Sequence, residues 1–161
     1  MPRGRARGDD LGYALLMLAV LTLLLAIDPS AVPATAPAPK AEILGFWKGH
    51  SICAKVKAAE FCRDEAVAYN FVDLSEQPTT VSLKAARIID NTVQPMYAIY
   101  FNYRPDERRW TSEFTRGRTH GLWSYVVNGD ELTGSLVLLP ELTVVRNVSA
   151  ERVAPDKVLA P

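Results

Sequence analysis

Hydrophobic and polar residues alternate in several runs of the chain from about residue 42 onward, which is the pattern of β-strands with one face turned to a core. In the segment 131–139, Leu132 and Leu136 fall on one face of the predicted strand. Thr133 and Ser135 fall on the other face, as is typical of a strand between a core and solvent. Segments with the period of a helix are almost absent, so the pattern predicts an all-β domain.

Turn-forming residues divide this domain into eight runs. Asn128-Gly129 is the clearest turn, because Asn-Gly suits a two-residue type I′ hairpin. Asp90-Asn91 and Pro140 mark two further turns. Strands are predicted at about residues 43–53, 65–73, 79–89, 94–104, 109–116, 119–127, 131–139 and 142–152.

Short connections join each predicted strand to the next, and the simplest topology for such strands is an antiparallel meander. Eight meandering strands favour closure, because a closed sheet has no exposed edges. We therefore expect an all-β fold, an eight-stranded antiparallel up-and-down barrel, over residues 42–153. A short flexible tail is expected at 154–161.

The N-terminus has a different pattern. The run from Leu11 to Ile27 carries no charge, follows a basic start and precedes a segment rich in Pro and Ala. These three parts are typical of a secretory signal cleaved after Ala34. The same run is close to the minimum length of a membrane-spanning helix, so an uncleaved anchor at residues 1–34 is the alternative. Either way the barrel is expected to be exported, periplasmic or extracellular, or anchored on the non-cytoplasmic side, behind a linker at 35–41.

Composition changes this picture little. The chain has 161 residues, 48% hydrophobic and 22% charged, which suits one globular domain after the N-terminal segment. The formal net charge is zero, which argues against a nucleic-acid partner. Contact with a membrane is expected only through the N-terminal segment, and the oligomeric state is left open.

Two glycines flank a tryptophan at the start of the domain, and all three share one face of the first predicted strand. Gly45 and Gly49 remove side chains where strands crowd at barrel closure, so the Trp47 ring can lie across the floor. On the last predicted strand, Arg146 and Arg152 have core-facing parity, and either guanidinium could stack on the indole. The alternative is that Trp47 is an ordinary core residue and both arginines lie at the surface.

Gly45-Phe46-Trp47 opening an eight-stranded meander, with an inward arginine such as Arg146 on the last strand, resembles the lipocalins and the wider calycin group. The resemblance implies a closed barrel with a cup for a small apolar or amphipathic molecule, without identifying that molecule. Candidates for the lining or floor of the cup are Trp47, Tyr100, Phe114 and Trp123.

The same aromatic residues raise a second hypothesis. A barrel of eight strands is just wide enough to be filled by side chains or to hold one small ligand. An enclosed apolar space of about 300 Å³ or more would favour a ligand. A filled interior would favour a structural or interaction protein of the cell envelope that works through its outer surface.

Two cysteines flank a short segment rich in helix formers. Cys53 ends the first predicted strand and Cys62 precedes the second, so a disulfide is expected to tie this loop in an oxidising compartment. Metal binding by both cysteines with His50 is the less favoured alternative, because a fourth ligand is missing. We predict neither a metal nor a cofactor.

Residues suited to catalysis are few, so an enzyme is the third and least favoured hypothesis. It would use His120, with Glu113 as the partner needed for general acid–base chemistry. Arginines at and after one predicted hairpin could form an anion site, although a solvated charged surface is the simpler interpretation. The candidates for that site are Arg109, Arg116 and Arg118.

Overall fold

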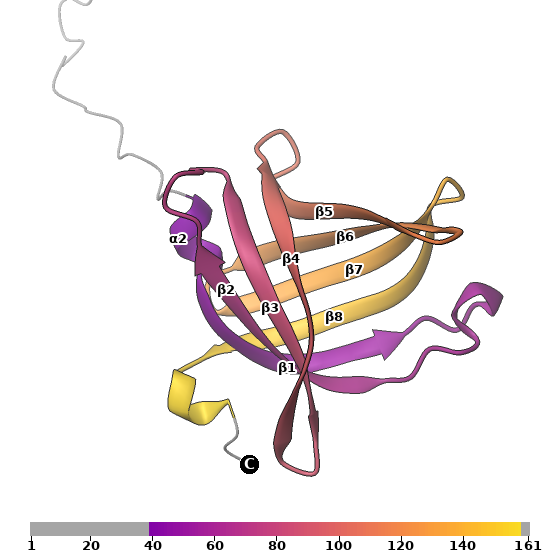
Figure 1. Cartoon of the computed structure of the whole chain (residues 1–161), viewed down its shortest axis with the longest axis horizontal. Helices are drawn as coiled ribbons and strands as arrows, with labels where there is room; N and C mark the ends of the chain where they lie inside the picture. The colour runs from indigo at the N-terminus through magenta and orange to yellow at the C-terminus, as the bar shows by residue number, and fades with distance from the viewer. Residues whose placement is uncertain (1–38, 159–161) are drawn as a thin grey trace, which may run out of the picture. The chain divides into compact units, whose positions relative to one another are not determined.

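The computed structural model describes residues 39–158, which form a closed eight-stranded antiparallel barrel (Figure 1). Each strand pairs with the next, and the last strand pairs with the first. The predicted fold is confirmed, and strand ends agree with the sequence prediction to within two residues. The signal or anchor predicted at 1–34 lies outside the described residues. The strands are β1 (Gly45–Cys53), β2 (Glu65–Asp73), β3 (Thr80–Ile89), β4 (Thr92–Arg104), β5 (Arg109–Arg116), β6 (Thr119–Asn128), β7 (Glu131–Leu139) and β8 (Thr143–Val153).

Three short helical elements accompany the strands. The helix α2 (Pro39–Ile43) occupies residues that the sequence pattern assigned to the linker and to the start of the first strand. The 3-10 turns η2 (Lys57–Ala59) and η3 (Pro155–Lys157) lie between β1 and β2 and after β8. Within residues 39–158, none of the helices is long and apolar enough to cross a lipid bilayer.

Trp47 closes the barrel at the end where α2 lies. Its side chain is fully buried, and its Nε1 donates a hydrogen bond to the carbonyl oxygen of Ile43 at 2.8 Å. The guanidinium carbon of Arg152 lies 4.3 Å from the centre of the indole. The same guanidinium donates to the carbonyl oxygens of Leu44 (2.7 Å) and Glu42 (2.5 Å). Arg152 therefore fastens the end of α2 and the chain just after it over the indole that forms the floor.

The stacking arginine is thus Arg152, and Arg146 lies elsewhere. Trp47 is directly opposite Arg152 in the pairing of β1 with β8, whereas Arg146 is opposite Cys53 at the other end of β1. A register shift between β7 and β8 inserts one residue, Val145, into β8. As a result Val145 is buried and Val144 is exposed, although strict alternation from the core-facing parity of Arg146 would place Val144 inside.

Two hairpin turns refine the predicted turn chemistry. Asp90 and Asn91 both have positive φ, 48° and 57°, as a type I′ turn requires. In the β6–β7 hairpin, Asn128 pairs with Glu131, so Gly129 and Asp130 are the central residues. Only Gly129 of these two has positive φ (62°), so this turn has the type II′ pattern instead of the predicted type I′.

Aromatic rings fill the half of the barrel next to the floor. Phe71, Phe101 and Tyr125 are buried, and their ring centres lie 5.2 to 6.0 Å apart in edge-on or tilted arrangements. Such offset contacts are the favoured geometry for aromatic pairs. This part of the interior is a packed core.

One strand pair is much shorter than the others. β4 and β5 share three residue pairs, at Asn102, Tyr103 and Arg104 of β4. Each other neighbouring pair of strands shares seven or more residue pairs. The first part of β4 therefore pairs only with β3. Beyond the three shared residue pairs, β4 and β5 diverge (Figure 1).

Candidate functional site

A cavity of about 210 Å³ lies inside the barrel at the end away from the floor. Its lining comes from β1, β2, β4, β6 and β8 and combines aromatic, aliphatic and charged side chains. The volume is below the threshold of about 300 Å³ of enclosed apolar space that we set as favouring a ligand, and below the range of about 300–1,000 Å³ usual for drug-sized ligands, so only a small molecule fits. The lining residues are Ser51, Glu65, Val67, Tyr69, Met96, Tyr97, Trp123 and Arg146.

Arg146 is the charged centre of this cavity. Its Nη1 donates to Ser51 Oγ at 2.6 Å and to Glu65 Oε2 at 3.0 Å, and its Nη2 donates to the carbonyl oxygen of Arg63 at 2.7 Å. The side chains of Arg146 and Glu65 are only 17% and 24% exposed. Charge-assisted hydrogen bonds of this kind fix both position and orientation, so the guanidinium is held in place before any ligand binds.

Three tyrosines surround the charged pair. Burial raises the pKa of Tyr97, and the neighbouring Tyr69 hydroxyl adds to this effect. Burial is also the largest cause of the raised pKa of Tyr69 and of the strongly raised pKa of Tyr125. All three phenols therefore remain protonated at neutral pH and can donate hydrogen bonds.

Tyr125 lies next to the cavity lining. Its ring stacks on Trp123 with 6.0 Å between centres and meets the ring of Tyr69 edge-on at 5.8 Å. Its hydroxyl is buried behind the lining, where its nearest polar neighbour is the hydroxyl of Tyr69. Tyr125 therefore supports the wall of the cavity from behind and is not one of its lining residues.

The four residues predicted for the lining or floor of the cup lie in different parts of the barrel. Trp123 lines the cavity, and Trp47 forms the floor beneath the packed core. Phe114 is half-buried and packs against the core cluster. Its ring lies so close to Gly121 that a Cβ there would be 2.7 Å from Phe114 Cζ.

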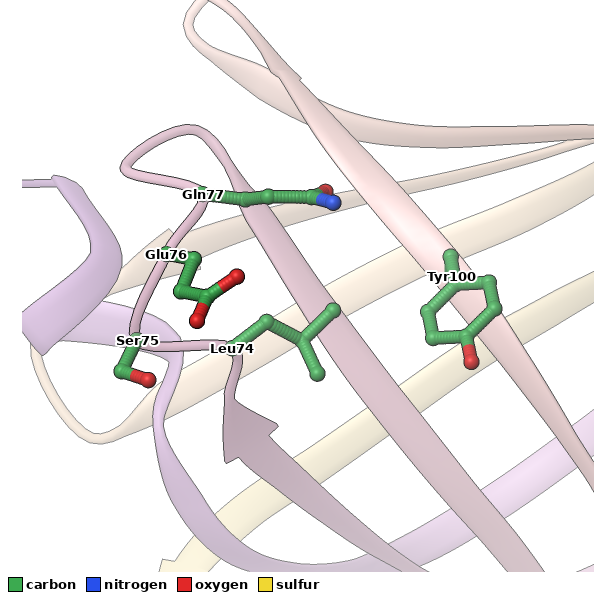
Figure 2. Close-up of a pocket in the computed structure, with 5 residues that line it drawn as sticks. All are labelled: Leu74, Ser75, Glu76, Gln77 and Tyr100. Atoms are coloured by element: carbon green, nitrogen blue, oxygen red, sulfur yellow. The ribbon is translucent and has the colours of Figure 1, made fainter.

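Tyr100 lies outside the interior. Its side chain is 64% exposed, and it borders a hollow of about 420 Å³ on the outer surface with the turn between β2 and β3. Figure 2 shows Tyr100 on β4 facing Leu74 and Gln77 across this hollow. Lys40 of α2 holds the turn by donating to the carbonyl oxygens of Leu74 and Gln77 and by an ion pair with Asp73.

The three arginines of the predicted anion site do not come together. Arg109 begins β5 and pairs with Glu107, its Nε 3.1 Å from Glu107 Oε2. Arg116 ends the same strand, and Arg118 follows in the turn at the opposite end of the barrel. At about 3.3 Å per residue, the length of β5 separates Arg109 from the other two.

The histidine of the enzyme hypothesis lies on the outer surface. His120 Nε2 is 2.5 Å from Glu113 Oε1, so the predicted partner is present. The two side chains are 43% and 61% exposed, and neither belongs to the interior cavity. Among the described residues, no group of three or more His, Cys, Asp or Glu is arranged to hold a metal ion.

The predicted disulfide is present and supports the cavity. Cys53 and Cys62 are bonded, and they close the loop that carries η2 beyond the end of β1 (Figure 1). The carbonyl oxygen that accepts from Arg146 belongs to Arg63, the residue after Cys62. The disulfide therefore helps to fix one wall of the charged site.

We expect the double substitution Cys53→Ser/Cys62→Ser to lower the free energy of unfolding by about 2–3 kcal/mol, because it frees a short closed loop in the unfolded chain. Urea denaturation followed by circular dichroism measures this change. Treating the unsubstituted protein with a reductant is the matched control and should give the same loss. A change below about 0.5 kcal/mol in both would contradict a stabilising role for the bond.

Sequence reasoning missed most of the cavity lining. Ser51 could have been found, because it shares the face of Trp47 and Gly49 on β1. Glu65 and Tyr69 likewise each lie two residues from the core residue Val67 and share its face of β2. Nothing local indicates that Glu65 meets Arg146, since the two residues are 81 positions apart.

The fold defines the class of protein as a small, closed, eight-stranded antiparallel β-barrel, the architecture that the resemblance to lipocalins implied. Among solved structures, the chain is similar to a redesigned beta barrel, with a TM-score of 0.52 and 11% identity over 73% of this chain and 96% of that one. It is also similar to fatty-acid-binding protein 1 of Echinococcus granulosus, with a TM-score of 0.40 and 14% identity over 71% of this chain and 99% of that one. No protein-family model matches the sequence, and no curated protein matches it. These similarities concern the fold alone.

Proposed function

We propose that this barrel is a non-catalytic binding protein that holds a small amphipathic molecule in its interior cavity. The observation that carries the proposal is a cavity of about 210 Å³ with a preorganised guanidinium, that of Arg146, in its wall. Ligand pockets typically combine an apolar lining with a few fixed polar groups, and this cavity has both. Val67, Met96 and Trp123 would receive the apolar part of the ligand, and the polar part would face Arg146.

The divergence of β4 and β5 supports a route into the cavity. Met96 and Tyr97 lie on the part of β4 that has no partner in β5, and both line the cavity. Tyr97 is 37% exposed and so extends from the cavity to solvent. A ligand could enter beside Tyr97 without breaking a strand pair.

We also propose that the barrel works outside the cytoplasm. The N-terminal pattern of basic, apolar and small residues supports this placement, and the disulfide between Cys53 and Cys62 agrees with an oxidising compartment.

A second candidate is a surface interaction in the cell envelope, with no interior ligand. The outer hollow beside Tyr100 favours it, since this large aromatic side chain is mostly exposed and borders about 420 Å³ of concave surface. The packed aromatic core next to the floor is compatible with both candidates.

Native mass spectrometry of the protein purified from its own host tests the first candidate. We expect a mass increment from a bound small molecule. The substitution Val67→Phe should abolish that increment, because Val67 is buried in the cavity wall and a phenyl ring would occupy the space.

The matched control is Tyr100→Ala, which removes an aromatic ring outside the cavity and should leave the increment unchanged. Retention of the ligand by Val67→Phe would place it elsewhere on the protein. The surface interaction would be favoured if the unsubstituted protein carries no small molecule and binds a partner protein that Tyr100→Ala no longer binds.

A further inference from the structure

The charge of the cavity is already balanced, and this limits what can bind. Within residues 39–158, Arg146 is the only cation in the lining, and Glu65, which is also in the lining, contacts it at 3.0 Å. The remaining polar groups of the lining residues are the hydroxyls of Ser51, Tyr69 and Tyr97 and the indole N–H of Trp123. The site therefore offers hydrogen bonds without a net positive charge.

An anionic ligand would meet two costs at this site. Its carboxylate would lose hydration on entering a largely buried space, and burial of a charge without its own partner is expensive. It would also approach the carboxylate of Glu65, since both would compete for Arg146. Displacing Glu65 would only move the unpaired charge from the ligand to the protein.

An uncharged acceptor meets neither cost. The phenol hydroxyls of Tyr69 and Tyr97 belong to the lining, and because burial raises the pKa of both they remain protonated and can donate hydrogen bonds. A carbonyl or ether oxygen could accept from one of these hydroxyls, and the aromatic rings of Trp123 and Tyr69 would contact the body of the ligand. The protein groups that face the ligand are thus mainly donors and rings.

The volume sets the size of the ligand. A dry cavity of about 150 Å³ is enough to bind benzene. The interior cavity of this barrel, at about 210 Å³, exceeds that volume by enough to hold a small substituent on the ring. A single ring with a short polar group fits, whereas a long acyl chain does not fit within the cavity.

We propose that the cavity selects an uncharged, single-ring ligand that carries a hydrogen-bond acceptor, and that it discriminates against the corresponding carboxylate because Glu65 already neutralises Arg146. This inference rests on the proposed binding function and names the class of ligand for the same site.

Acetophenone and benzoate are suitable probes, since they have the same number of heavy atoms and differ chiefly in charge. In NMR titrations at pH 7 followed at the Met96 methyl group, we expect acetophenone to bind at least about tenfold more tightly than benzoate. Ethylbenzene, which lacks the acceptor, should bind more weakly than acetophenone.

The substitution Glu65→Gln removes the compensating charge and keeps the shape of the side chain. We expect it to raise the affinity for benzoate about tenfold and to change the affinity for acetophenone less than about threefold. Glu131→Gln is the matched control, because Glu131 is exposed at the start of β7 near the floor end and should leave both affinities unchanged.

The outcomes separate the two proposals. Benzoate binding as tightly as acetophenone to the unsubstituted protein, or no gain for benzoate in Glu65→Gln, would overturn the charge argument and leave the binding function standing. Failure of every probe to bind at the cavity would overturn the inference about the ligand class, and a small molecule still found by native mass spectrometry would then keep the binding function. If Glu65→Gln does not fold, the double substitution Arg146→Gln/Glu65→Gln replaces it. This neutral site should still prefer acetophenone, and a preference for benzoate there would contradict the inference.

Discussion

Replacing Trp47 by alanine is expected to lower the free energy of unfolding by about 3–5 kcal/mol, the usual cost of removing a large buried aromatic side chain. Trp47 is fully buried, its ring is covered by the guanidinium of Arg152, and its Nε1 holds the carbonyl oxygen of Ile43. The substitution would leave a hole in the floor and free the end of α2. Because whole domains are stable by only about 5–15 kcal/mol, this loss should be evident in urea denaturation followed by circular dichroism.

The control for this change is Trp47→Phe, which keeps a ring and removes the indole nitrogen. We expect it to cost about 1–2 kcal/mol, chiefly through the unsatisfied carbonyl of Ile43 and the weaker stacking with Arg152. A loss below about 1 kcal/mol for Trp47→Ala would show that the floor does not depend on the indole.

Replacing Gly49 by alanine is expected to cost about 3 kcal/mol, at the upper end of overpacking effects. A Cβ at Gly49 would lie 2.0 Å from the carbonyl oxygen of Ser149 and 2.5 Å from Ala150 Cα. Both atoms belong to the backbone of β8 and cannot rotate away, so β1 and β8 would have to separate where they close the barrel. Thermal unfolding and urea denaturation both measure this loss.

Gly117→Ala separates the effect of crowding from the loss of a glycine. A Cβ at Gly117 would have no neighbour within 4 Å, although its φ of 60° disfavours other residues. We expect that change to cost about 1 kcal/mol. Equal losses at the two positions would mean that the close approach of β1 and β8 does not limit stability.

The arrangement of strands could be predicted because the relevant signals are local. Alternation of residues such as Leu132 and Thr133 defines a strand, and turns such as Asp90-Asn91 separate one strand from the next. The helix α2 was missed because five residues give too little periodic pattern to recognise. The insertion of Val145 was also missed, since a bulge depends on the register of the neighbouring strand.

The cavity was less predictable than the fold. The parity of Arg146 indicated an inward side chain, but its partner Glu65 is set by how β1, β2 and β8 meet in space. Tyr100 illustrates the opposite error, because a strand that is apolar on both faces gives no sign of which face is inside. Candidate residues chosen from aromatic content alone therefore included one on the outer surface.

The short pairing between β4 and β5 makes one joint of the cylinder weaker than the other seven. Thermal fluctuations concentrate where the fewest hydrogen bonds must break, so widening at this joint needs far less free energy than global unfolding. The floor held by Trp47 and Arg152 lies on the far side of the packed rings and does not take part. The barrel can therefore widen between β4 and β5 while its other strand pairs stay intact, which is the motion that the proposed entry of a ligand beside Tyr97 would need.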